Sequence, residues 1–111
     1  MRWGEYKVEY KVLYYVGESI DLKTDYDKGV VLLEKDTVYL VDKEYNKKEV
    51  AKIKEVELLR PSRVATIIEV KTEEGNIFIA VYRVLVGNSF GILNRGKTEE
   101  LYYELKNYIW W

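Results

Sequence analysis

Three residue types are missing from this chain of 111 residues: cysteine, histidine and glutamine. The absence of cysteine excludes disulfide bonds, thiolate nucleophiles and thiolate metal ligands. The absence of histidine removes the usual general base at neutral pH and the commonest transition-metal ligand. We therefore expect a protein that is not an enzyme and that needs no metal or other cofactor. The lack of glutamine beside abundant Glu, Lys, Tyr, Val and Ile is typical of proteins from high-temperature organisms, so the composition predicts a thermophilic source.

Length and charge set the next bounds. A chain of this length forms one domain with one core, so residues 1–111 are expected to be a single unit. Hydrophobic residues make up 48%, and 18 basic residues against 19 acidic ones leave a mixed-sign surface that indicates no particular partner. The sequence contains no apolar run of roughly 18 residues and no basic, then apolar leader segment. These features predict a soluble, cytoplasmic protein.

Alternating apolar and polar residues predict strands over most of the chain. Apolar residues fall on every second position from residue 6 to residue 16, and a break or bulge is expected at Gly17. Residues 30–33 and 38–41 predict one hairpin, and residues 64–71 and 76–86 predict another. Residues 47–60 stay open between a helix and two short strands, because apolar residues recur every three positions there among good helix formers. Their place between two hairpins favours strands.

One amphipathic helix is predicted at residues 98–109. Thr98 suits the N-cap position, and Glu99 and Glu100 suit a first turn, where the helix dipole favours negative charge. One side of this helix is apolar and is expected to join the core: Leu101, Leu105, Tyr108 and Ile109, with Tyr102 at the edge. The strand at residues 77–86 is apolar on both faces apart from Arg83, so both faces should be covered, one of them by the helix.

This order of elements resembles the pleckstrin-homology-like (PH-like) superfold, including its GRAM-type relatives. The resemblance covers residues 10–109 and depends on the hairpin at 29–41, the charged strand at 48–56, and the hairpin through Glu74, Gly75 and Asn76 that leads into the helix. It implies an α+β fold, mostly antiparallel: a partly open barrel of about seven strands capped by one C-terminal helix. Such modules usually bind proteins, peptides or lipid headgroups and rarely catalyse reactions.

Phosphoinositide binding is not expected. Members of the superfold that bind these lipids place Lys and Arg around the loop between their first two strands. The matching segment, residues 21–28, carries three aspartates against two lysines and would repel an anionic headgroup: Asp21, Asp25 and Asp27 against Lys23 and Lys28. The resemblance therefore predicts a module that recognises a protein or peptide, with self-association along an exposed strand at residues 6–16 as one form of that activity.

Large aromatic residues near the chain ends are the candidate partner-binding residues. These are Trp3, Trp110, Trp111 and Tyr102. Exposed aromatic side chains are enriched at interfaces, because they bury a large area at little conformational cost. The same side chains also suit a role in the protein's own core, and the sequence leaves both roles open.

A P-loop pattern, G-x-x-x-x-G-K-[ST], provides an alternative function. Gly91, Gly96, Lys97 and Thr98 match it between a predicted strand and the predicted helix, so a nucleotide-binding role has to be weighed. P-loop enzymes place this loop early in a parallel sheet and supply a metal-binding acid from a later strand, whereas 13 residues follow Thr98. A simple loop with Thr98 as N-cap is favoured.

A central group of basic residues suggests a nucleic-acid-binding module as a second alternative. It comprises Lys43, Lys47, Lys48, Lys52, Lys54, Arg60 and Arg63, with Tyr39 and Tyr45 nearby for stacking. Five acidic residues interleave with them, which favours a solvated face of mixed charge. The pair Asp25 and Asp27 lacks the spacing of a calcium loop, so no metal site is predicted.

Overall fold

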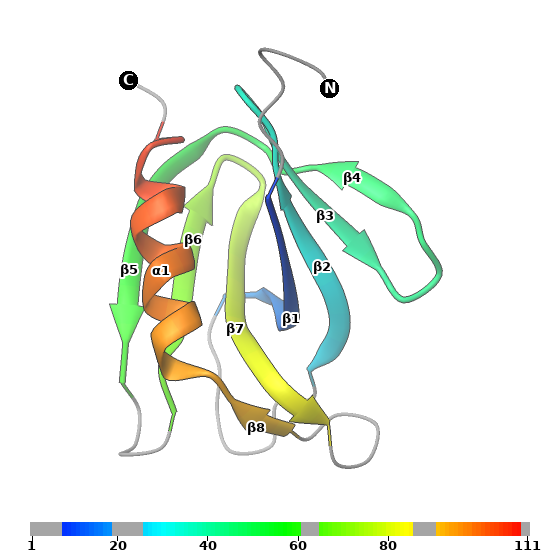
Figure 1. Cartoon of the computed structure of the whole chain (residues 1–111). Helices are drawn as coiled ribbons and strands as arrows, with labels where there is room; N and C mark the ends of the chain where they lie inside the picture. The colour runs from blue at the N-terminus through cyan, green and yellow to red at the C-terminus, as the bar shows by residue number, and fades with distance from the viewer. Residues whose placement is uncertain (1–7, 19–25, 61–64, 86–90, 110–111) are drawn as a thin grey trace.

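A computed structural model describes residues 8–18, 26–60, 65–85 and 91–109 (Figure 1). The elements are β1 (Val8–Gly17), β2 (Asp27–Leu33), β3 (Val38–Asp42), β4 (Lys47–Glu49), β5 (Ile53–Leu59), β6 (Ile67–Thr72), β7 (Gly75–Leu85), β8 (Gly91–Leu93) and α1 (Arg95–Lys106). Seven strands form an open antiparallel sheet in the order β4-β3-β2-β1-β7-β6-β5, and β8 pairs with β7. The predicted α+β class, mostly antiparallel with one C-terminal helix, is confirmed.

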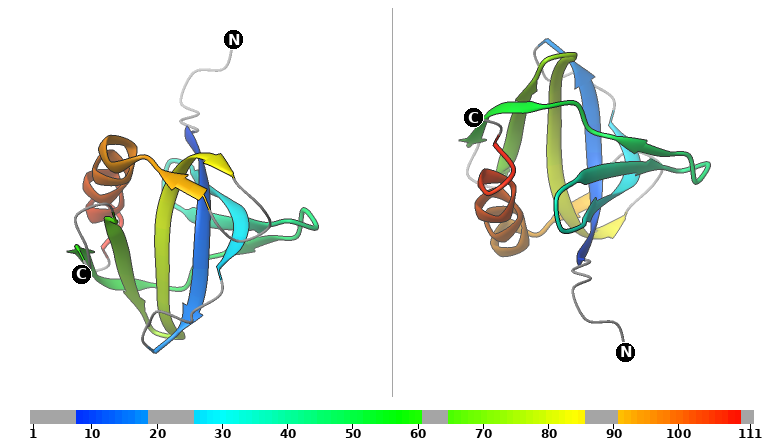
Figure 2. Two further views of the ribbon diagram at one scale, coloured as in Figure 1. Left: turned by 90° about the horizontal axis from the view of Figure 1, so that it is seen from below. Right: turned by 90° about the horizontal axis from the view of Figure 1, so that it is seen from above.

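Two meanders make up this sheet. Strands β1 to β4 follow one another in sequence and in space, as do β5 to β7, and pairing of β1 with β7 joins the two groups. Figure 2 shows the chain after β4 crossing from the side of the β3–β4 hairpin to the side of α1, where β5 lies. Both predicted hairpins are confirmed, by β2–β3 and by β6–β7.

Residues 47–60 form strands, which resolves the one segment that the sequence left open. β4 pairs with β3, and β5 pairs with β6 through a register shift between Ile53 and Glu55. This register shift explains why apolar residues recur every three positions in the segment. Ile53 lies before the shift and Val56 after it, and both side chains are buried. Pairing with neighbouring strands outweighs the modest helix propensity of the segment.

The strand at residues 6–16 is not the exposed edge that we expected. β1 pairs with β2 from Val8 to Tyr14 and with β7 from Val12 to Gly17, so it lies in the centre of the sheet. Tyr6 and Lys7 lie outside the described residues. The prediction of self-association through the backbone of β1 is therefore wrong for residues 12–14, which pair with both β2 and β7. Their backbone N–H and C=O groups already form hydrogen bonds within the chain.

The core lies between the two meanders and α1. Its main cluster takes buried side chains from six strands and from the helix, which contributes Leu101 and Leu105. Both faces of β7 are buried over residues 78–81: Ile79 and Val81 join this main cluster, and Phe78 and Ala80 form a second cluster with Ile67. The covering of both faces of this strand, with α1 on one side, is as predicted.

The helix begins earlier than predicted. Asn94, not Thr98, is the N-cap, and its side chain accepts a hydrogen bond from the backbone N–H of Lys97 at 3.0 Å. Asn is at least as good a cap as Thr, and the Thr98 side chain is completely buried inside the helix. The helix ends at Lys106, and Ile109 instead forms a parallel bridge with Ile53. Within the described residues, no helix is long and apolar enough to cross a membrane.

Candidate functional site

Strand β5 forms one end of the sheet and is the basis of the candidate site. It is seven residues long and pairs with β6 on one side. In the described part of the chain, its other edge pairs only at Ile53, with Ile109. An unpaired edge presents backbone N–H and C=O groups that can pair with another chain. We call this edge, together with the side of α1 next to it, the β5 edge site.

The outward face of the sheet at this edge is acidic. Glu55 and Glu57 of β5 lie opposite Lys71 and Glu69 of β6. The Lys71 ammonium lies 3.7 Å from the Glu55 carboxylate and 3.4 Å from that of Glu57. Desolvation acts to lower the pKa of Lys71, but the negative charges of Glu55, Glu57 and Glu69 outweigh it and raise this pKa. Three carboxylates face two ammonium groups, those of Lys71 and of exposed Lys54 in β5, so one excess negative charge remains beside the free edge.

The flank of α1 next to β5 is held by ion pairs. Arg60, directly after β5, donates a hydrogen bond from Nη2 to Glu99 Oε2 at 2.7 Å, and Arg95 Nε lies 3.4 Å from the same oxygen. The hydrogen bond from Arg60 is the main cause of the lowered pKa of Glu99. These contacts tie the first half of α1 to the end of the strand.

Two tyrosines lie on α1 beyond Glu99. Tyr102 is half-buried against the core, with the Lys106 ammonium 5.3 Å from its ring centre. Tyr103 is 64% exposed, and its ring meets that of Tyr102 edge to face at 5.1 Å. Tyr102 follows Glu99 by three residues and Tyr103 by four, which places both on the side of α1 that faces Arg60 and the β5 edge site. The other three predicted partner-binding residues, Trp3, Trp110 and Trp111, lie outside the described residues. Tyr103 is not among the residues predicted from the sequence, because the contact between Glu99 and Arg60 that places this side of α1 next to β5 is a tertiary one.

The P-loop match does not form a phosphate-binding loop. Gly91 lies in β8 and Gly96 in α1, and Asn94 alone separates the two elements. The Thr98 hydroxyl is buried, accepts a hydrogen bond from the backbone N–H of Val81 and donates one to the carbonyl of Asn94. The ammonium of Lys97 lies 3.4 Å from Glu100. Neither side chain is placed to take the phosphate and magnesium roles, because the Thr98 hydroxyl is already engaged and Ile92 and Leu93 are paired in β8 instead of forming an open loop around a phosphate.

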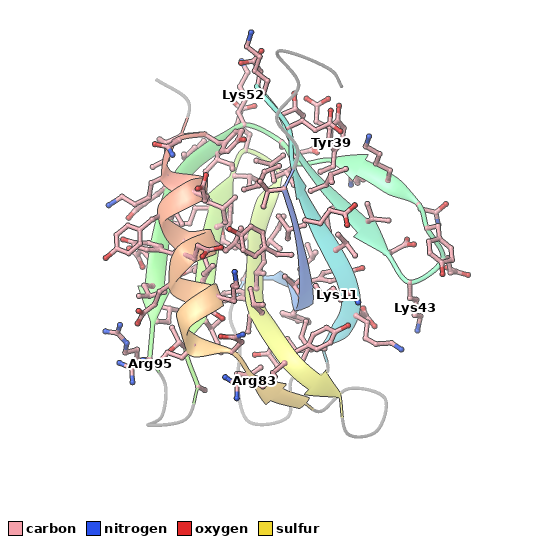
Figure 3. The ribbon with its side chains drawn as sticks, viewed as in Figure 1. Lys11, Tyr39, Lys43, Lys52, Arg83 and Arg95 are labelled. Carbon is pink, nitrogen blue, oxygen red and sulfur yellow. The ribbon has the colours of Figure 1, made fainter. Side chains whose placement is uncertain are left out.

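The central group of basic residues does not form one surface. Lys47 pairs with Glu34 at 3.3 Å and lies 4.1 Å from the ring centre of Tyr39, whereas Arg60 pairs with Glu99 beside α1. Figure 3 shows Lys43 and Lys52 at different ends of the molecule. Arg63 lies outside the described residues. The alternative function that used this group as a single patch therefore loses its geometric basis.

The described residues include no cluster of three or more acidic side chains placed to hold a metal ion. Asp27 is exposed at the start of β2, and Asp25 lies outside the described residues. Comparisons with protein-family models, curated proteins and solved structures return no match. We therefore infer function from the sheet edge and the surfaces around it.

Proposed function

We propose that this chain is a PH-like binding module, a partly open barrel of about seven strands capped by its C-terminal helix, that recognises a protein partner without catalysis. The two meanders in the order β4-β3-β2-β1-β7-β6-β5, followed by one helix, support the resemblance. A main core cluster with side chains from both meanders and from α1 is consistent with a sheet that curves around its interior. As fold alone is a weak warrant for function, the proposal depends on the free edge of β5.

The recognition mode that follows is strand addition. An extended segment of the partner pairs with β5, and its backbone takes up the N–H and C=O groups that β6 leaves free. Four new hydrogen bonds at about 1 kcal/mol net each correspond to a Kd of about 1 mM. Side-chain contacts must therefore supply most of the useful affinity and all of the specificity.

The charge beside β5 indicates the chemistry of the partner segment. Basic side chains at alternate positions of an added strand would lie on the same face as Glu55 and Glu57, and opposite charges on neighbouring strands contribute roughly 0.2–1 kcal/mol each. Tyr102 and Tyr103 on α1 provide aromatic surface near the same edge. We therefore expect an extended peptide that alternates basic and apolar residues.

A different protein suits this edge better than a second copy of the chain. Two β5 strands paired with each other would bring Glu55 and Glu57 of both chains together. Like charges on neighbouring strands are destabilising. Self-association through β5 is therefore disfavoured, although the edge is free.

The test uses a six-residue peptide of alternating lysine and valine, with a peptide of alternating glutamate and valine as its control. NMR of the ¹⁵N-labelled protein should show the lysine peptide shifting amides of residues 53–59 and slowing hydrogen exchange of those that do not bond β6. The double variant Glu55→Lys/Glu57→Lys should abolish this response. The variant Glu44→Lys, a single exposed charge reversal in the turn at the opposite edge of the sheet, should retain it.

Two results would overturn the proposal. One is a response to both peptides that is spread over the surface without a maximum at β5. The other is binding of the lysine peptide that survives Glu55→Lys/Glu57→Lys unchanged, because the edge charges would then play no part.

A further inference from the structure

A second surface lies away from α1, over the outer side of β1, β2 and β3. It is a depression of about 250 Å³ lined by three lysines and two tyrosines, with Val30 and Val41 among its other residues: Lys11, Lys28, Lys43, Tyr45 and Tyr82. Figure 3 shows Lys11 and Lys43 on the side of the molecule away from the helix. We call these five residues the lysine–tyrosine depression.

The register of the strands explains why the lysines meet. Lys11 lies opposite Val30, and Val30 lies opposite Val41, so these residues share one face of the sheet. Lys28 lies two residues before Val30 in β2, and side chains two apart on a strand lie on the same face. Lys43 follows β3 as the first residue of the β3–β4 turn and lines the same depression. With neighbouring strands about 4.8 Å apart and about 3.3 Å per residue along a strand, the backbones of Lys11 and Lys43 lie about 12 Å from each other.

These three lysines are set apart by gathering around one depression, not by being unpaired, because Lys35 and Lys48 also form no ion pair within the described residues. In the described part of the chain, none of the three forms an ion pair, whereas other lysines and arginines pair with glutamates: Lys47, Lys71, Lys97, Arg60 and Arg95. Like charges on neighbouring strands cost stability. A chain with 19 acidic residues thus leaves three ammonium groups together around one depression, which favours an anionic ligand there.

The one carboxylate that lines the depression is engaged elsewhere. Asp42 Oδ1 accepts hydrogen bonds from the backbone N–H groups of Glu44 at 2.8 Å and Asn46 at 3.0 Å, and Oδ2 accepts one from the Asn46 amide at 3.2 Å. Asp42 therefore serves to shape the β3–β4 turn. The pKa of Asp42 is lowered chiefly by the hydrogen bond from the Asn46 backbone, and the charge of Lys43 adds to this. Asp42 therefore offsets part of the positive charge near Lys43, although no described lysine forms an ion pair with it.

Tyr45 is held at the rim in a costly conformation. Its φ angle is +68°, in the left-handed region that Gly and Asn adopt readily and a bulky side chain does not. Its side chain is 87% exposed, so packing does not explain the choice of tyrosine. Non-glycine residues in this region cluster at functional sites, and here the strain presents an aromatic ring next to Lys43.

We propose that the lysine–tyrosine depression binds single-stranded nucleic acid, with successive phosphates on Lys11, Lys28 and Lys43 and a base stacked on Tyr45. Lysines spread over two strands and the β3–β4 turn match a row of phosphates better than one phosphate group, and an exposed aromatic ring provides the stacking surface that such binding uses. This surface is separate from the β5 edge site and does not depend on the proposed peptide binding. It also differs from the basic group seen in the sequence, which lacks Lys11, Lys28 and Tyr82.

The experiment is fluorescence anisotropy with labelled 12-residue oligo(dT) and oligo(U) between 25 and 200 mM salt. Three phosphate contacts predict a slope of about −2 for log K against log salt concentration. The triple variant Lys11→Gln/Lys28→Gln/Lys43→Gln should weaken binding roughly tenfold or more at low salt and flatten the slope. The matched triple Lys35→Gln/Lys48→Gln/Lys54→Gln removes the same charge at exposed positions outside the depression and should leave both unchanged.

A second variant separates stacking from folding. Tyr45→Asn suits the left-handed backbone, so it should fold at least as well as the parent while binding roughly tenfold more weakly. The proposal is overturned if neither oligonucleotide binds with the predicted salt slope, or if the two triple variants lose affinity equally. It is also overturned if the protein binds phosphatidylserine vesicles through the same lysines and ignores both oligonucleotides.

Discussion

The hydroxyl of Thr98 accepts a hydrogen bond from the backbone N–H of Val81 at 3.1 Å, which joins α1 to β7 across 17 positions of sequence. The same hydroxyl donates to the carbonyl of Asn94 at 2.8 Å. Thr98 is completely buried and shares the first turns of the helix with the cap residue. One side chain therefore sets how the helix enters the core and satisfies a polar group of the central sheet.

Replacing Thr98 tests this connection. Thr98→Val keeps the shape but leaves the Val81 N–H without its partner, so we expect a loss of about 1–3 kcal/mol in the free energy of unfolding. Thr98→Ser keeps the hydroxyl and loses one methyl group, which should cost about 0.8 kcal/mol. Denaturant unfolding of both variants measures the difference. A valine variant as stable as the serine variant would contradict the assigned role.

Asn94 offers a test of where the helix begins. Asn94→Ala removes the side-chain acceptor for the Lys97 N–H and should lower stability by about 1 kcal/mol. Asn94→Asp retains an acceptor at the positive end of the helix dipole and should be close to the parent protein. Urea unfolding followed by circular dichroism compares the two. If Asn94→Ala is as stable as Asn94→Asp, the side chain of Asn94 does not stabilise the start of the helix.

The pair of Arg60 and Glu99 predicts a pH-dependent stability. In the folded protein the pKa of Glu99 lies below its ordinary value of 4.5, and the hydrogen bond from Arg60 is the largest cause. A carboxyl group whose pKa is lower in the folded protein than in the unfolded chain stabilises the fold at pH values above its unfolded pKa. This stabilisation is lost as the pH falls through the pKa of the folded state.

Arg60→Gln should therefore destabilise the protein at pH 7 more than at pH 3. Thermal unfolding of the parent and the variant at both pH values measures the two differences. Arg95→Gln removes the longer contact to the same oxygen and should show the same trend more weakly. An effect of Arg60→Gln that is equal at both pH values would rule out the ion pair as its cause.

Tyr45 should be a position where the natural residue is not the most stable one. Tyr45→Asn relieves the left-handed strain and is expected to raise the free energy of unfolding by about 1 kcal/mol. Tyr45→Ala keeps a Cβ in the same conformation and should not bring this gain. Thermal unfolding of the parent protein and the two variants, without ligand, measures these differences in stability. Equal stability of Tyr45→Asn and Tyr45→Ala would contradict the assigned strain.

Local signals in the sequence were enough for the hairpins and for the existence of the helix. The β2–β3 and β6–β7 hairpins form where polar turns separate apolar runs, because those cues act between residues close in sequence. The start of the helix was misplaced because Asn94 and Thr98 are both good caps, and burial of Thr98 under β7 depends on contacts that lie outside the segment. The P-loop match failed for a similar reason, as a motif of eight residues does not fix the backbone around it.

Local patterns in the chain predict the α+β class, the two hairpins and the chemistry that missing cysteine and histidine exclude. The central place of β1 in the sheet, the position of β5 at an edge and the gathering of Lys11, Lys28 and Lys43 around one depression follow from the folded structure alone. The physical reason is that β1 pairs with β7 across more than 50 residues, as in Val12 with Val81. Such a pairing is chosen by burial of both strands in a common core, which no local pattern of residues records.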